Sequence, residues 1–332
     1  MRIAVIGAGA IGSAMGALLG HAGHEVTLVG RAAHVAAIRA VGLQVDGCLG
    51  SFTAPLAATE RLEQPPELAL VTTKTHDLQQ ALRSQRTALA EVPVVVIHNG
   101  VRGLELATEV LPAHHVWSGV TLMIATYLVP GRVSLAAQGW LLIGRAAGPL
   151  DAPTAALAAV LNGALPTSGS ANIRAAQWTK LIVNLNNALA AVSGLDSAGV
   201  LADAVLPRLS IGLMREGLRV VERAGIRLAS LPDLSAAQLR LAVRLPLWLA
   251  VRLAARKARG VRVAGPVWGS TLQSLTRGQL TEIDYLNGEV VRLGQQVGLP
   301  TPLNARVVEL VHEVERSGRH IHPSELGTLL RR

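Results

Sequence analysis

Aromatic residues are scarce in this chain and make up 2% of its 332 residues. Proteins that bind single-stranded nucleic acid stack bases on aromatic side chains, so this class of function is not expected. The formal charge of +9 does not change this, because most arginines are scattered singly and form no recognisable DNA-binding motif. One basic cluster, residues 240–262, has helical spacings and is interpreted mostly as a solvated face, with an anionic partner or a membrane surface as the alternative.

Cysteine is nearly absent, since Cys48 is the only one. A single cysteine excludes a disulfide framework and a multi-cysteine metal site, and it fits a reducing compartment. We expect Cys48 to be a small buried or half-buried residue. The histidines do not form a metal site either: His21 and His24 flank a turn, and the adjacent His114 and His115 cannot converge on one ion from a strand. No metal is expected.

Long apolar runs without charge are also lacking. The most apolar late segment, residues 239–260, is interrupted by Arg240, Arg244 and Arg252, which are costly at the centre of a bilayer. Glycines break the apolar run of residues 1–13, which is a poor signal peptide. We therefore expect no membrane span and a cytoplasmic location, while the oligomeric state stays open and residues 235–260 could form a homodimer interface.

The pattern of apolar residues predicts two domains. Over residues 1–170, short β-branched runs alternate with helical patterns, which is typical of an α/β Rossmann-type domain with a mostly parallel sheet. Strand-like runs on both sides of residues 129–132 predict an antiparallel end to this sheet. Over residues 171–332, helical periodicity dominates and predicts an all-α domain. The expected parallel strands are residues 2–7, 24–30, 68–73 and 93–100.

The stretch "GAGAIG" follows the first expected strand and begins a helix. In this context Gly7 makes a tight turn, Gly9 lets the backbone approach a pyrophosphate, and Gly12 allows close helix packing. The helix N-terminus offers N–H groups to the phosphates. The stretch predicts a dinucleotide site, with a purely structural turn as the alternative; its residues are Gly7, Ala8, Gly9, Ala10, Ile11 and Gly12.

The end of the second strand favours NADP(H) as this dinucleotide. An NAD site usually has an acidic residue there, whereas this chain has Gly30 and Arg31, and Arg31 could pair with a 2′-phosphate. Lys74 and Asn99 follow the next two expected strands, whose carboxyl ends border the ligand crevice in such sheets. The alternatives are a surface arginine, a solvated lysine and a turn asparagine.

Lysine is rare in this chain, with three among 31 basic residues. Lys180 and Asn184 are four residues apart, so on a helix over residues 178–189 they share one face and can reach one ligand. The alternative is a lysine that reaches along the helix to water. Glu282, Asp284 and Glu289 are expected on another helix, and one of them could compensate Lys180.

The ordered set of motifs resembles the ketopantoate reductases, also called 2-dehydropantoate 2-reductases. After "GAGAIGS" come "HNG" at 98–100, "KLIVN" at 180–184, "STLQS" at 270–274 and "TEIDYLNG" at 281–288. The resemblance covers nearly the whole chain. It implies NADPH-dependent reduction of a 2-keto acid to a 2-hydroxy acid, with a Rossmann domain followed by a helical domain.

The resemblance also implies a role for particular residues. Lys180 would donate the proton to the ketone oxygen, which suits a lysine better than an arginine. Glu282 would lie where cofactor and substrate meet. The remaining residues implied are Asn99, Asn184 and Ser270 for the substrate, and Gly7, Gly9, Gly12, Arg31, Lys74 and Ala125 for the cofactor.

The sequence departs from the family pattern at substrate positions. Where members continue with "NPLTA", this chain reads "ALAAV" from Ala188, an asparagine expected near 198 is alanine or serine, and Ser274 stands in place of an aspartate. The segment around 230–262 looks like an insertion. The leading hypothesis is reduction of 2-dehydropantoate; the alternatives are another 2-oxo acid and a non-catalytic NADP-binding sensor.

Overall fold

The computed structural model describes residues 1–146, 148–259 and 268–330. It divides into two compact units, Met1–Arg174 (unit 1) and Ala175–Arg332 (unit 2). The division lies four residues beyond the end of the first domain expected at residue 170.

The main sheet of unit 1 has eight strands in the order β12-β11-β8-β7-β6-β1-β2-β5. Its pairs are parallel except β8 with β11. The chain passes from β1 outward to β2 and then returns to β6 on the other side of β1, which creates a switch point at the carboxyl ends of β1 and β6. This confirms the Rossmann-type prediction. The strands are β1 (Arg2–Ile6), β2 (Glu25–Val29), β5 (Ala57–Thr59), β6 (Leu68–Val71), β7 (Val94–Ile97), β8 (Val116–Thr121), β11 (Leu141–Gly144) and β12 (Thr167–Gly169).

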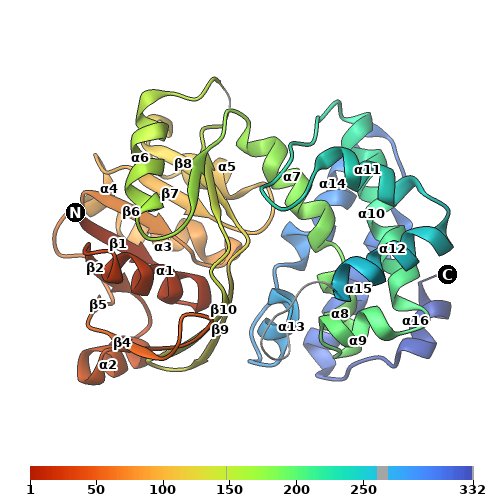
Figure 1. Cartoon of the computed structure of the whole chain (residues 1–332), viewed down its shortest axis with the longest axis horizontal. Coiled ribbons are helices and arrows are strands. Elements are labelled where there is room, and N and C mark those ends of the chain that lie inside the picture. The colour runs from red at the N-terminus through yellow and green to blue at the C-terminus, as the bar shows by residue number, and fades with distance from the viewer. Residues whose placement is uncertain (147, 260–267, 331–332) are drawn as a thin grey trace. The chain divides into compact units, whose positions relative to one another are not determined.

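The central strands are apolar throughout because both of their faces are buried. In β6, Leu68 and Leu70 belong to one hydrophobic cluster, and Ala69 and Val71 belong to another on the opposite face. The first cluster includes residues of α1 (Ala10–His21), α2 (Ala32–Val41) and α6 (Ala152–Asn162). The second includes residues of α3 (Leu78–Ser84), α4 (Arg86–Leu89) and α5 (Gly103–Thr108), so helices cover both faces (Figure 1).

The runs around residues 129–132 pair antiparallel as predicted, but they belong to a second sheet and do not end the main one. This sheet has the order β4-β3-β10-β9. Its apolar side, with Val133 and Leu135 buried, joins the cluster that contains α1 residues, and β3 pairs with β10 in parallel. Cys48 follows β3 in a turn and is exposed, so its expected burial is wrong. The strands are β3 (Leu43–Gly47), β4 (Phe52–Ala54), β9 (Ile124–Val129) and β10 (Arg132–Ala137).

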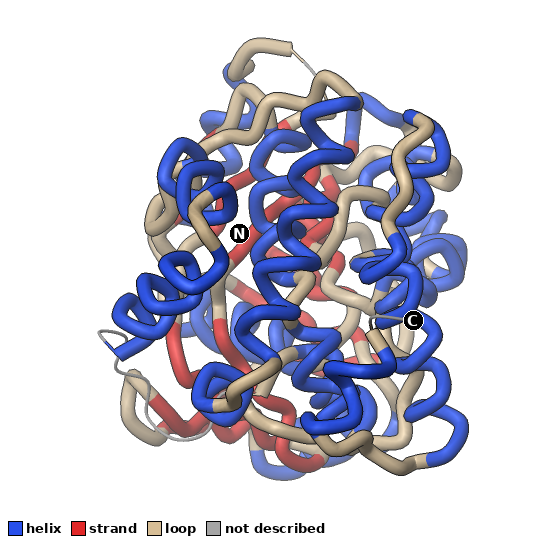
Figure 2. The backbone as a smooth tube through the Cα atoms, turned by 90° about the vertical axis from the view of Figure 1, so that its right-hand side faces the viewer, coloured by secondary structure: helices blue, strands red, loops and turns tan. Residues whose placement is uncertain are grey.

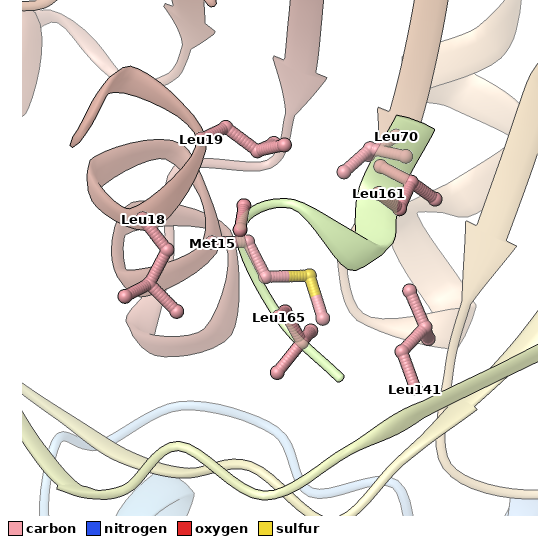
Figure 3. A pocket seen from close by; sticks show the side chains of 8 residues that line it. Met15, Leu18, Leu19, Leu70, Leu141, Leu161 and Leu165 are labelled. Atoms are coloured by element: carbon pink, nitrogen blue, oxygen red, sulfur yellow. The ribbon is translucent and has the colours of Figure 1, made fainter. Parts of the chain in front are cut away.

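A small apolar pocket lies in the core of unit 1, among α1, α6, β6 and β11 (Figure 3). Its lining side chains are all apolar and include Met15, Leu70, Leu141 and Leu161. Because it offers no polar group to orient a ligand, we regard it as a packing gap of the core.

Unit 2 confirms the all-α prediction within its described residues, which form helices and turns and one isolated bridge between Leu231 and Leu234 (Figure 2). The helix expected over residues 178–189 is interrupted: α7 ends at Asn184, and α8 begins at Asn187. The helices are α7 (Ile173–Asn184), α8 (Asn187–Ser193), α9 (Ser197–Ala202), α10 (Leu206–Arg223), α11 (Ala236–Arg244), α12 (Leu247–Arg259), α13 (Ser270–Leu275), α14 (Asn287–Val297), α15 (Pro302–Ser317) and α16 (Pro323–Leu329).

Buried polar groups tie α10, α14 and α15 together. The Glu216 carboxylate accepts hydrogen bonds from the backbone N–H groups of Leu303 and Asn304, at the positive N-terminal end of α15. The Asn304 amide also donates to Glu216 and accepts from Asn287, whose amide donates to the Leu185 carbonyl just after α7. The start of α14 is thereby fixed to the end of α7.

The basic segment from residue 240 onward is largely helical, and residues 260–262 lie outside the described part. Arg240 and Arg244 both lie near the Glu222 carboxylate, and Arg244 donates two hydrogen bonds to it. Leu241 and Trp248 are 64% and 66% exposed. Among the helices described, none is long and apolar enough to cross a membrane.

Candidate active site

The glycine loop is bonded to the end of β2 and pressed against the end of β6. The N–H groups of Gly7 and Ala8 both donate to the Val29 carbonyl, at 2.9 and 3.1 Å. Gly7 has φ +97°, and a Cβ there would lie 2.6 Å from the Thr73 nitrogen. A Cβ on Gly12 would lie 2.3 Å from the Gly7 carbonyl oxygen. Both positions therefore require glycine for the loop to close.

The fold itself does not require glycine at position 9. A Cβ built there would meet only the Gly7 carbonyl oxygen, at 4.0 Å, so it would fill space that the protein leaves open. Gly9 is the N-cap of α1, and the first N–H bonded within the helix is that of Ser13, so the N–H groups of Ala10, Ile11 and Gly12 precede the helical ladder. The first turn of α1 carries no acidic residue. This geometry fits a pyrophosphate.

Arg31 lies beside this loop. It is exposed and is the N-cap of α2, two residues after β2 ends. A Cβ on Gly30 would come within 2.9 Å of the Ala8 side chain, so the chain before Arg31 packs directly on the glycine loop.

Lys74 and Asn99 lie at the same edge of the main sheet as the glycine loop, because each follows the carboxyl end of a parallel strand that is near β1. Both side chains are half-buried. Ala125 differs from them: it is buried in β9 of the second sheet, where it pairs with Leu135, and β9 contacts α1.

Lys180 and Asn184 share a face of α7. Within Ala175–Asn184 the partly buried residues are Lys180, Val183 and Asn184. Val183 and Asn184 follow Lys180 by three and four residues, so all three lie on one face of the helix. The rest of this stretch is buried, Trp178 completely so. The lysine is therefore held on a helix whose other faces are fixed by packing.

The environment of Lys180 changes its acidity. Burial lowers the pKa of Lys180 to about 8, and the charge of the nearby Glu282 carboxylate acts in the opposite direction. Of the three carboxylates considered from the sequence, Glu282 is thus the one that compensates Lys180. Asp284 bonds instead to His312, and Glu289 forms an ion pair with Arg292.

Glu282 is not on a helix, which corrects the expectation for it. It is a buried residue in the loop that directly precedes the short 3₁₀ helix η3 (Ile283–Tyr285). The segment is held by α15: the Thr281 N–H donates to Glu315 at 2.8 Å, and His312 lies within hydrogen-bond distance of both Glu315 and Asp284. Burial by itself would lower the pKa of His312, but the two carboxylates outweigh it and the pKa is raised.

Ser270 begins α13, and α13 packs on α8. A Cβ on the preceding Gly269 would lie 3.1 Å from the Asn187 amide oxygen. Asn187 is a residue that we did not single out from the sequence, although it is the third asparagine in "NLNN"; only packing shows that it lies beside the start of α13.

Two of the positions that depart from the family pattern are buried. Ala188 is 1% exposed within α8, and Ser274 is buried, with its hydroxyl donating to the Ser270 carbonyl at 3.0 Å. In the part of the chain that the structure covers, no group of three His, Cys, Asp or Glu side chains could hold a metal ion.

Comparison with protein families matches both halves of the chain. The model of "Ketopantoate reductase PanE/ApbA" matches residues 3–148, and that of "Ketopantoate reductase PanE/ApbA C terminal" matches residues 172–315. A 2-dehydropantoate 2-reductase of Pyrococcus horikoshii is 28% identical over 96% of this chain and 99% of its own length.

Solved structures are similar over nearly the whole length as well. A PanE/ApbA family ketopantoate reductase from Ralstonia eutropha JMP134 has a TM-score of 0.77 and 31% identity, covering 96% of this chain and 100% of its own. D-mandelate dehydrogenase in a ternary structure with NADH and anilino(oxo)acetate has a TM-score of 0.82 and 26% identity, covering 96% and 99%.

Proposed function

The chain belongs to the ketopantoate reductase family of oxidoreductases, and from this premise we propose that it reduces a 2-keto acid to the 2-hydroxy acid with NADPH. We take 2-dehydropantoate as the substrate and pantoate as the product, in keeping with the relatives of that name. The two domains are residues 1–170 for the cofactor and 171–332 for the substrate.

One observation supports this function above the others: a partly buried lysine with a pKa of about 8, beside a buried carboxylate. A lysine in this state is mostly protonated at neutral pH and gives up its proton far more readily than a solvated one. A non-catalytic NADP-binding sensor would have no use for such a group.

The reaction needs a hydride and a proton. NADPH, when bound, supplies the hydride to the keto carbon. The Lys180 ammonium stabilises the negative charge that develops on the keto oxygen and then donates its proton to that oxygen. Glu282 keeps the lysine protonated before the reaction and lies where substrate and cofactor meet.

The other site residues orient the two reactants. Asn184 shares the α7 face of Lys180, and it binds the substrate together with Ser270 and Asn99. The peptide N–H groups from Ala10 to Gly12 bind the pyrophosphate, with Gly7, Ala8 and Gly9 shaping the loop, while Lys74 and Ala125 also contact the cofactor.

Arg31 makes NADPH the preferred cofactor. It occupies the position after β2 where an NAD site usually has a carboxylate, and it is exposed beside the glycine loop. A guanidinium can bind a 2′-phosphate with two hydrogen bonds, which NADH cannot receive. The location in the cytoplasm and the homodimer stay predictions of the sequence.

A second candidate is the same chemistry on another 2-oxo acid. Ala188 is buried and apolar where the family pattern has an asparagine, and the similar D-mandelate dehydrogenase was solved with anilino(oxo)acetate, an aromatic oxo acid. A site that lacks a hydrogen-bond partner discriminates less against a substrate that lacks the matching hydroxyl.

The test is the oxidation of NADPH by the purified chain in the presence of different oxo acids. We expect the highest kcat/KM with 2-dehydropantoate. A higher kcat/KM with an aromatic 2-oxo acid would favour the second candidate, and cofactor binding without turnover of any oxo acid would support the sensor.

A further inference from the structure

A chain of hydrogen bonds ends on the glycine loop. The Gly131 N–H, in the turn between β9 and β10, donates to Nδ1 of His34 at 2.9 Å. Nε2 of His34 lies 3.0 Å from the Ser13 hydroxyl, and this hydroxyl donates to the Ala8 carbonyl at 3.2 Å. His34 and Ser13 are 3% and 0% exposed. We call these four groups the His34 relay.

The direction of each bond in the relay follows from the first donor. A backbone N–H can only donate, so Nδ1 of His34 is an acceptor and the ring proton is on Nε2. Nε2–H then donates to the Ser13 oxygen, which leaves the Ser13 proton for the Ala8 carbonyl. Burial lowers the pKa of His34, which agrees with the neutral ring that this chain of bonds requires.

The relay fixes one peptide group of the loop. The carbonyl of the Ala8–Gly9 peptide accepts from Ser13, and its N–H donates to the Gly7 carbonyl at 2.7 Å. Both ends of this peptide are therefore held, directly before the helix turn whose N–H groups fit a pyrophosphate. If Ser13 lost its hydroxyl, the peptide could rotate and the ring N–H of His34 would be buried without its acceptor.

The relay also joins α2 to the loop, because His34 lies in α2 and Arg31 is the N-cap of that helix. The turn at Gly131 approaches α2 closely, since a Cβ on Gly131 would lie 2.9 Å from the Ala37 side chain. The Tyr127 ring packs against His34, with a centroid distance of 5.0 Å. The second sheet thereby supports the position of His34.

We propose that His34 and Ser13 are positioning residues for the cofactor: they orient the Ala8–Gly9 peptide so that the loop is ready for the pyrophosphate before binding. The inference rests on the proposed function. Preorganisation of this kind raises affinity because the loop does not need to be ordered during binding. Since NADPH and NADH both contain the pyrophosphate, the relay affects both, unlike Arg31.

The experiment measures the Kd of NADPH and NADH by calorimetry for the wild type, Ser13→Ala, His34→Asn, His34→Gln and the double variant Ser13→Ala/His34→Asn. Asparagine keeps an acceptor near the Nδ1 position but has no donor near Nε2, and glutamine keeps a donor near Nε2. We expect Ser13→Ala and His34→Asn each to raise both Kd values about tenfold, and the double variant to add little to either. His34→Gln should stay within about threefold of the wild type.

Thr154→Val is the matched control. Thr154 lies in α6 of the same unit, and the substitution removes a buried hydroxyl that accepts a hydrogen bond from the Trp117 side chain. It should lower the melting temperature and leave both Kd values unchanged. If Ser13→Ala does not fold, His34→Asn alone carries the test.

The proposal would be overturned if Ser13→Ala and His34→Asn lowered the melting temperature but kept wild-type Kd values. The two residues would then have only a structural role. Additive effects in the double variant would show that the two residues do not act as one relay. If the wild type binds neither cofactor, the proposed function fails as well, so the two failures are distinguishable.

Discussion

The Glu282 carboxylate raises the pKa of the Lys180 ammonium, against the burial that brings this pKa down to about 8. The two opposing effects leave the lysine charged at neutral pH but close to its titration range. A general acid is most effective when its pKa is near the working pH. If Lys180 is the proton donor that we propose, the pair gives the proton transfer a defined pH dependence.

Replacing Lys180 by alanine should reduce kcat by roughly 10²- to 10⁴-fold, the usual effect of losing a general acid. Steady-state kinetics with saturating NADPH measure this. Lys180→Arg is the control for charge alone: it keeps a cation but donates a proton poorly, so its kcat should also fall. Wild-type kcat in either variant would remove Lys180 from the proposed mechanism.

The pH profile of kcat should fall as the pH rises through about 8, because Lys180 loses the proton that it must donate. Glu282→Gln removes the charge that raises this pKa. The alkaline limb of its profile should therefore move to lower pH. A limb that stays in place, or moves upward, would contradict the electrostatic role of Glu282.

Replacing Arg31 by alanine should raise the Kd of NADPH roughly ten- to a hundredfold and change that of NADH little, because only NADPH has the 2′-phosphate. Arg39→Ala is the control on the same helix; it removes an equal charge, and Arg39 bonds instead to the Ala58 carbonyl. Equal losses for both cofactors in Arg31→Ala would refute the 2′-phosphate role.

Two alanine substitutions in the glycine loop should affect different properties, one the stability of the fold and the other the affinity for the cofactor. Gly12→Ala places a Cβ against the Gly7 carbonyl and should destabilise the fold by about 1–3 kcal/mol, as overpacking does. Gly9→Ala has room for its Cβ and a backbone conformation open to any residue, so it should fold normally and lose cofactor affinity. Thermal melts and calorimetry distinguish the two, and normal binding by Gly9→Ala would contradict the pyrophosphate assignment.

The pH dependence of stability should contain a contribution from His312, because its pKa is raised in the folded chain. Such a contribution is fully present below the unfolded value of 6.5 and is lost as the pH rises through the folded pKa. The melting temperature of the wild type should therefore exceed that of His312→Asn most at acidic pH. A difference in melting temperature that grows as the pH rises would contradict a raised pKa of His312.

The parallel strands and the glycine loop could be predicted because their signals are local. A continuous apolar run indicates burial on two faces. Gly7 and Gly12 mark a backbone that a Cβ would obstruct, and Gly9 marks the space that a pyrophosphate needs. The second sheet could not be predicted, because β3 pairs with β10 and places Gln44 beside Arg132 across a long stretch of chain. No local pattern specifies that register.

The carboxylate partner of Lys180 illustrates the same limit within the site. Spacing along the sequence could not choose among Glu282, Asp284 and Glu289, because the choice depends on how the 281–285 segment is held. The structure resolves it through contacts with α15, more than 25 residues further along the chain, where Glu315 accepts from Thr281 and His312 bonds Asp284. Asp284 is thus bonded to His312, and Glu282 is the carboxylate whose charge acts on the lysine.

The chain has a single thiol, and it is exposed in the turn after β3. A maleimide dye would therefore attach at Cys48 alone, without prior removal of other cysteines. The Cys48 N–H bonds to the Leu135 carbonyl of β10, the strand that follows the Gly131 turn. A fluorophore at this position would give a spectroscopic signal from the sheet that supports His34, recorded in solution on the otherwise unaltered protein.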